Sequence, residues 1–249
     1  DGSMIVAQLS DNLIKSGWNV TVLKPSWVAI DSQRVISRTA NVISIKEVNE
    51  TEIKNILEDN FQLDSVIYLH PESKIESIVY PQASKQGLEL AFILAKLCNV
   101  KAAKVARASF MVVTHQGGQI GFESHDGAVV SKHSDLVQGG LNGLVKTLSH
   151  EWTEAGVFCR AIDVASSLSA TTVANIITDE LADVDTVLSE VGYDETGRLT
   201  LIGEVTDSYA LTSGNSIDKD SVFLVSGGAK GVTAHCVIEI AKQYQAKFV

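Results

Sequence analysis

Short apolar runs alternate along this chain with longer segments in which apolar residues recur every three or four positions. The apolar runs have the length and composition of strands buried in a parallel sheet, and they cover residues 19–23, 41–45, 65–69, 110–114 and 158–164. The periodic segments predict helices, and they cover residues 4–16, 50–57, 81–97, 134–152 and 171–181. This alternation predicts a doubly wound α/β fold with a parallel sheet.

Local signals refine several of these elements. Gly17 is placed to close the first helix, and Asn49 with Glu52 three residues later predicts a capped helix start. The segment 81–97 is apolar nearly all round, which predicts a helix covered on more than one side. Residues 187–202 read as a hairpin that turns near 194–197. The first helix and strand resemble the second half of a βαβ unit, and we expect its first strand to lie upstream of Asp1.

The helix at 134–152 carries three glycines, Gly139, Gly140 and Gly143. Each costs roughly 1 kcal/mol relative to Ala in a helix interior, so we expect another element to pack against the backbone there. The partner is either the second part of this chain or another protomer. The tether between the two parts favours the internal contact.

The C-terminal stretch predicts a strand at 222–225, a tight turn, and a helix in which Val237, Ile238 and Ala241 share one face. The turn consists of Ser226, Gly227, Gly228, Ala229, Lys230, Gly231, Val232 and Thr233. Glycines let the backbone approach phosphates, and a helix start favours negative charge, so this arrangement predicts a dinucleotide pyrophosphate site. The alternative is a structural strand–helix turn, since Thr233 stands where a third glycine is usual.

Composition narrows the possible functions of the 249 residues. A net charge of −10 without a basic block argues against nucleic acid and anionic membranes as partners. Three scattered cysteines fit a reducing, cytoplasmic compartment, and no signal peptide or membrane span is evident. The histidines show no metal-ligand spacing. Asp126 and Asp135 read as members of a solvated surface.

The glycine turn resembles the TGxxxGxG turn of short-chain dehydrogenases/reductases. Residues 136–151 resemble the catalytic helix of that family, which begins YxxxK, and residues 159–165 resemble the strand after it. Matching Gly140 and Leu141 to the family pattern places Ser134 at the catalytic Tyr and Gln138 at the catalytic Lys. Neither can supply that chemistry, because Ser lacks a phenol-like pKa and Gln carries no charge.

The chain thus combines a reductase-like first part that lacks the catalytic Tyr and Lys with a second part that begins with a nucleotide-binding turn. This order resembles the ketoreductase region of polyketide and polyunsaturated fatty acid synthases. The resemblance implies a Rossmann-like, degenerate short-chain reductase fold followed by the first β-α-β of a second Rossmann unit. It implies a non-catalytic structural subdomain at 1–205, a linker at 206–221, and the truncated start of a catalytic, NADP-binding subdomain at 222–249. Catalytic residues are expected beyond Val249.

The resemblance further implies reduction of β-ketoacyl thioesters, held on an acyl carrier protein, to β-hydroxyacyl thioesters with NADPH. The other domains of the same multienzyme would be partners. Lys230 would contact the 2′-phosphate of NADP, or it is a solvated loop lysine. Two alternatives are a non-catalytic scaffold module of a megasynthase and a free-standing reductase, the latter disfavoured because its nucleotide turn would sit at the wrong end.

Overall fold

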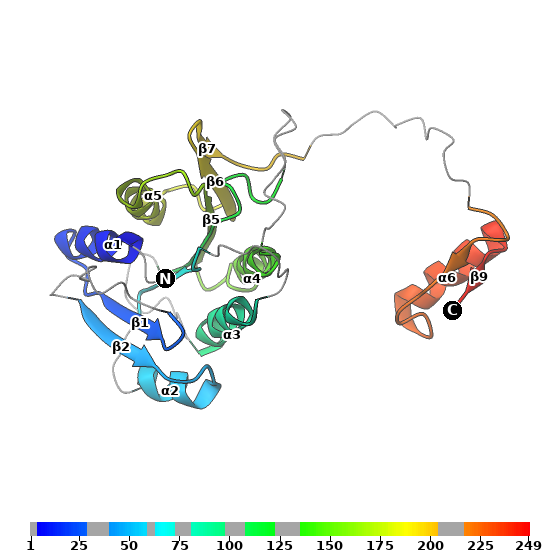
Figure 1. Cartoon of the computed structure of the whole chain (residues 1–249), viewed down its shortest axis with the longest axis horizontal. Helices are drawn as coiled ribbons and strands as arrows, with labels where there is room; N and C mark the ends of the chain where they lie inside the picture. Colours follow the sequence, from blue (N-terminus) through cyan, green and yellow to red (C-terminus); the bar gives the residue numbers. More distant parts are fainter. Residues whose placement is uncertain are drawn as a thin grey trace. The chain divides into compact units, whose positions relative to one another are not determined.

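The computed structural model describes residues 4–28, 40–58, 63–72, 81–97, 108–122, 135–203 and 217–249. The chain divides into two compact units, Asp1–Leu201 and Ile202–Val249 (Figure 1). The first unit contains α1 (Met4–Lys15), β1 (Thr21–Pro25), β2 (Asn41–Ile45), α2 (Glu50–Glu58), β3 (Ser65–Leu69), α3 (Gln82–Leu97), β4 (Ala108–Thr114), α4 (Val137–Glu151), β5 (Val157–Val164), α5 (Ala170–Ala182), β6 (Glu190–Asp194) and β7 (Gly197–Leu199). The second contains β8 (Val222–Phe223), α6 (Gly231–Tyr244) and β9 (Lys247–Phe248).

The described strands of the first unit form two sheets. One has the order β3-β4-β5-β6-β7 and is parallel except for the β6–β7 hairpin, which turns between Asp194 and Gly197 as the sequence predicts. The other pairs β1 with β2 in parallel, with Val22 opposite Val42. A mostly parallel sheet connected by helices confirms the doubly wound α/β prediction.

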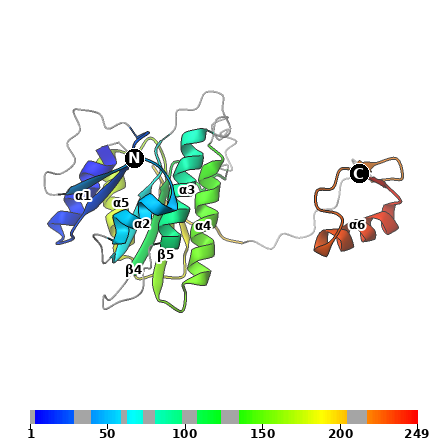
Figure 2. The same ribbon diagram turned by 90° about the horizontal axis from the view of Figure 1, so that it is seen from below.

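Helices cover both faces of these sheets. Phe110 and Val112 of β4 share a core with helices α2, α3 and α4, whereas Met111 and Val113 share a second core with α1 and α5. Alternate residues of a strand point to opposite faces, so these helices form two layers with the strands between them. Figure 2 shows α3 and α4 side by side, with α1 and α5 across the strands from them.

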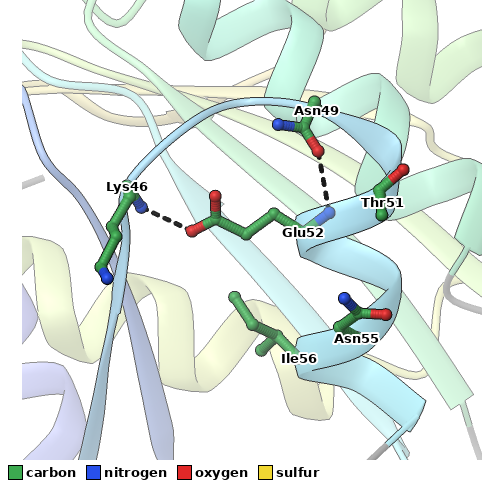
Figure 3. Close-up of a pocket in the computed structure, with 6 residues that line it drawn as sticks. All are labelled: Lys46, Asn49, Thr51, Glu52, Asn55 and Ile56. Carbon is green, nitrogen blue, oxygen red and sulfur yellow. Dashed lines mark hydrogen bonds between the residues drawn. The ribbon is translucent and has the colours of Figure 1, made fainter.

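Two predicted helix ends are confirmed. Gly17 closes α1 with φ +88°, a conformation that favours glycine. At the start of α2, Asn49 Oδ1 accepts a hydrogen bond from the Glu52 N–H at 2.8 Å, and the Glu52 carboxylate accepts one from the Lys46 N–H at 2.7 Å (Figure 3). The open hollow of about 640 Å³ beside this cap is lined by Lys46, Asn49, Thr51, Glu52, Asn55 and Ile56, and its Asn49 and Glu52 side chains are occupied by the capping bonds.

A buried charge network fixes α5 against β5, β6 and β7. Arg160 of β5 is fully buried and donates to Glu180 and Asp183, while Glu180 also accepts from Tyr193 and Arg198. Each charge in the network has an opposite partner, which compensates for its removal from water. No sequence signal predicted this network, because its members come from four elements that meet only in the fold.

Two predictions about packing need correction, and a third is untested. The strand at 65–69 is mostly half-buried rather than buried. Helix α3 buries one broad face, and Phe92 on the other face is 55% exposed, so it is not covered all round. Within the first unit, a Cβ at Gly140 of α4 would meet Leu88 of α3, and nothing described lies within 4 Å of one at Gly139 or Gly143. A contact of these glycines with the second part of the chain or with another protomer stays a prediction.

The second unit is a single βαβ arrangement. Strands β8 and β9 are parallel, with Val222 opposite Lys247 and Phe223 opposite Phe248, whose rings stack at 5.2 Å between centroids. Helix α6 connects them and has no buried residue. None of the helices in the described part of the chain is long and apolar enough to span a membrane.

Candidate functional site

The glycine turn of the second unit joins the end of β8 to the start of α6. Gly227 and Gly231 have φ of +73° and +69°, which a residue with a side chain adopts only under strain. A Cβ at Gly228 would lie 3.0 Å from Val225 Cγ1, tighter than ordinary contact. The backbone path of the turn therefore favours glycine at Gly227 and Gly231 for conformation, and a side chain at position 228 would require Val225 to shift by a few tenths of an ångström.

The start of α6 has no side-chain cap. Its N-cap, Lys230, has extended backbone and makes no side-chain capping bond, unlike Ser169 at the start of α5. The first N–H groups of a helix have no partner within the helix, and the helix dipole favours negative charge there. Lys230 and Thr233 are both exposed at this end. Strand, turn and helix start thus have the local form of a phosphate-binding turn.

In the first unit, the carboxyl ends of the strands meet the start of α4, where the resemblance places a vestigial catalytic centre. Gln138, in the Lys position, is buried, and its Oε1 accepts a hydrogen bond from the backbone N–H of His115 at 2.6 Å. Ser134, in the Tyr position, lies outside the described residues. The Gln138 carbonyl thus ties α4 to the end of β4.

Asp135 belongs to this network, and its assignment to the solvated surface is wrong. Its Oδ2 lies 3.2 Å from His70 Nε2, with both side chains only 1% exposed, and its Oδ1 accepts from the Val137 N–H at 3.0 Å. Burial favours a higher pKa for Asp135, but hydrogen bonds from His70, Ser84 and Val137 outweigh it and hold the pKa below its ordinary value. Its place just before a helix is a usual capping position, a signal that could have predicted this role.

Asp163 at the end of β5 is a second buried carboxylate that the sequence did not single out. It accepts hydrogen bonds from Thr114 Oγ1 at 2.9 Å, from the Gln116 N–H at 2.6 Å and from the Ile120 N–H at 2.9 Å. The loop after β4 is thereby fixed to β5. Beside it, burial lowers the pKa of His115, which favours the neutral imidazole.

Among the described residues, no three His, Cys, Asp or Glu side chains gather as a metal site would require. Asp126, His125 and His133 lie outside the described residues. Cys159 is buried, which raises its pKa to about 12, and Cys236 is exposed on α6.

A second, smaller hollow of about 230 Å³ lies beside α4. It is lined by Gln116, Ile120, Phe122, Gly139, Asn142, Gly143, Lys146, Glu190 and Leu201.

Comparison with known proteins agrees with this fold. No family model matches the chain. The chain is 34% identical over 152 residues to one of the subunits of the polyunsaturated fatty acid synthase from a Thraustochytrium species. This match covers 61% of this chain and 5% of that protein. The chain is therefore similar to a small part of a much longer synthase polypeptide.

Solved structures of short-chain oxidoreductases have a similar fold. A metagenomic short-chain oxidoreductase in complex with NADP superposes with a TM-score of 0.57 at 16% identity, over 76% of this chain and 91% of that one. A Bacillus thuringiensis protein described as a 3-oxoacyl-reductase gives 0.55 at 16% identity, over the same shares of the two chains. The chain has the short-chain dehydrogenase/reductase fold, as the sequence predicts.

Proposed function

We propose that this chain is part of a β-ketoacyl-ACP reductase in a multifunctional polyunsaturated fatty acid or polyketide synthase. Residues 1–205 would form a non-catalytic bracing subdomain, 206–221 a linker, and 222–249 the start of the catalytic subdomain. The enzyme would reduce β-ketoacyl thioesters on an acyl carrier protein to β-hydroxyacyl thioesters, using NADPH, beside the other domains of the same multienzyme. The similarity to part of a polyunsaturated fatty acid synthase supports this context.

The observation that carries the proposal is the uncapped start of α6 behind a turn that favours glycine. These residues fit a pyrophosphate: Ser226 to Thr233 present backbone N–H groups, and the missing side chains at Gly227 and Gly228 allow close approach. NADPH, when bound, supplies the hydride that reduces the ketone. The turn would hold its phosphates, with Lys230 near the 2′-phosphate.

The bracing role of the first unit rests on the network around Gln138. An amide that accepts a backbone hydrogen bond cannot act as the cation that lowers the pKa of a catalytic phenol. The proton donor would therefore come from residues that follow Val249 in the catalytic subdomain. A scaffold module without any catalysis is the alternative, and the same network is compatible with it.

An assay of this chain, and of the protein extended through the complete second domain, tests the proposal with NADPH and a β-ketoacyl thioester mimic. We expect turnover in the extended protein and none in this chain alone. Gly231→Val should weaken NADPH binding strongly, because a β-branched residue adopts the φ of +69° only under strain. Extended protein that folds but neither binds NADPH nor turns over would establish the scaffold alternative. Turnover by this chain alone would refute the bracing role.

A further inference from the structure

The smaller hollow, beside α4, is built by one side of that helix and by segments of three other parts of the first unit. The helix contributes four residues spaced three or four positions apart, which therefore share one side of it: Gly139, Asn142, Gly143 and Lys146. The segment after β4, the first residue of β6 and the chain beyond β7 contribute the rest: Gln116, Ile120, Phe122, Glu190 and Leu201. Gln138, which bonds to His115, does not line the hollow, so the hollow is separate from that contact.

Asn142 places a buried acceptor without a partner at this hollow. The residue is 5% exposed, and its side-chain Oδ1 accepts no hydrogen bond. Among the described residues, Arg160 Nε is the other buried side-chain atom in this state, and the remaining nitrogens of its guanidinium bond within the charge network. An unpaired buried oxygen costs free energy. Asn142 Oδ1 is therefore an acceptor that a bound donor would satisfy.

The charged groups of the hollow neutralise each other. Lys146 Nζ lies 2.7 Å from Glu190 Oε2, and the Glu190 side chain is mostly buried. A ligand with a net charge would have to compete with this ion pair for one of its members. The hollow therefore favours a neutral ligand.

The rim of the hollow is apolar. Phe122 is 60% exposed and Leu201 is exposed as well. Ile120, just before them in the lining, has φ +58°, which is uncommon for a β-branched residue, and its N–H is held by Asp163 Oδ2 at 2.9 Å. On the helix side, nothing described lies within 4 Å of a Cβ at Gly139 or Gly143. A flat apolar group thus finds an aromatic ring at the rim and open backbone on the helix.

We propose that this hollow binds a small neutral carboxamide whose N–H donates to Asn142 Oδ1. A primary carboxamide or a lactam carries an N–H and a C=O on the same side. It can donate to Oδ1 and accept from the Nδ2 hydrogens of Asn142 at the same time. A hydroxyl meets one end of the Asn142 amide only, and a ketone or an ester supplies no donor. The apolar substituent of the ligand would lie against Phe122 and Leu201.

The size of the hollow agrees with this class of ligand. Sites for drug-sized molecules measure about 300–1,000 Å³, and this hollow measures about 230 Å³. It therefore suits a carboxamide that carries one ring or a short chain. A water molecule could also donate to Asn142, but it would make no use of the apolar rim. Ligands that share an apolar body and differ only in their donor separate these two occupants.

NMR titration of the present chain with benzamide and acetophenone tests the proposal. The two molecules have nearly the same shape, but acetophenone has a methyl group in place of the NH₂ and cannot donate. We expect benzamide to shift the backbone amides of Gly139 and Gly143 and the side-chain amide of Asn142, while Gly17 of α1 stays unchanged. Benzamide should bind about tenfold more tightly than acetophenone, because it alone satisfies Oδ1. Benzyl alcohol should also bind more weakly than benzamide.

Asn142→Leu separates recognition from folding. Leucine is similar in size and removes the unpartnered oxygen, so urea unfolding should find the variant at least as stable as the wild type. The variant should bind benzamide and acetophenone equally. Asn55→Leu, which replaces an exposed asparagine of α2 at the larger hollow, is the matched control and should keep the preference for benzamide.

Four results would overturn the proposal. One is an absence of shifts at the reporters, and another is equal binding of benzamide and either of the other two probes. A third is a preference for benzamide that survives in Asn142→Leu, or a marked loss of stability in that variant, since Oδ1 would then have a partner in the folded protein. The fourth is a shift of the reporters with protein concentration alone, because a second copy would then cover the hollow. None of these readouts involves NADPH or turnover, so the proposed function can fail independently.

Discussion

The side-chain carbonyl of Gln138 accepts a hydrogen bond from the backbone N–H of His115 at 2.6 Å. This contact joins the end of β4 to the first turn of α4, where the resemblance to short-chain reductases places the catalytic Lys. A donor–acceptor pair of this kind fixes two elements and offers no proton to a substrate. Gln138 is therefore part of the packing between helix and sheet.

Gln138→Leu should destabilise the first unit by about 1–3 kcal/mol, because it leaves the partly buried His115 N–H without its acceptor. Urea unfolding followed by circular dichroism measures this loss. Gln82→Leu, at an exposed position of α3, is the matched control and should cost much less. Gln138→Lys should be destabilising as well and should create no reductase activity. A stable Gln138→Leu variant would show that the contact contributes little.

The Asp135 carboxylate should give the protein an acid-sensitive stability. Its pKa is lower in the folded chain than in the unfolded one, so its contribution is fully present above the unfolded pKa of about 3.9. That contribution is lost as the pH falls toward the folded pKa. Unfolding measured from pH 6 to pH 3 should show this decline, and Asp135→Asn should flatten it. Asp179→Asn, which removes a carboxylate of α5 outside this network, should leave the decline in place.

Arg160 and Arg198 both bond to Glu180 and Asp183, but they differ in burial. Arg160 is 0% exposed and Arg198 is 38% exposed. Arg160→Ala should cost about 3–5 kcal/mol, because it removes the buried cation beside Glu180 and leaves that carboxylate with only the more exposed Arg198 as a counter-charge. Arg198→Ala should cost about 1 kcal/mol or less, since water screens its ion pairs. Denaturant unfolding of the two variants compares these costs, and equal losses would show that burial does not set the strength of the network.

Periodicity was sufficient to predict most of the fold. A local sequence pattern predicts an element whose formation depends on residues close to it in the chain. The strands at 41–45 and 65–69 and the capped start of α2 are of this kind. The burial of β3 does not depend on its own residues. An apolar strand reads as buried in sequence, whereas its exposure here reflects which strands lie beside it.

The buried polar groups were the hardest to predict. Asp135 and His70 are 65 positions apart, and Asp163 receives its hydrogen bonds from residues 43 to 49 positions away. A carboxylate in a polar stretch reads as a surface group until the fold places donors around it. The glycine turn is different, because its residues are contiguous and its form follows from local sequence.

Lys230 is the residue of the turn through which the choice between NADPH and NADH can be tested. It is exposed at the start of α6, whose dipole already favours negative charge. If its ammonium reaches the 2′-phosphate, the charge-assisted hydrogen bond is worth about 1.5–3 kcal/mol. In the protein extended through the second domain, Lys230→Ala should therefore weaken NADPH binding roughly ten- to a hundredfold and leave NADH nearly unchanged.

Fluorescence titration of both cofactors against wild type and variant measures this difference. Lys242→Ala, in the last turn of the same helix, removes an equal charge far from the turn and should affect neither cofactor. Because the 2′-phosphate is absent from NADH, a contact with it must produce unequal losses. Equal losses for the two cofactors would mean that Lys230 supports the backbone of the turn, and selection of NADPH would then fall to other residues of the second domain.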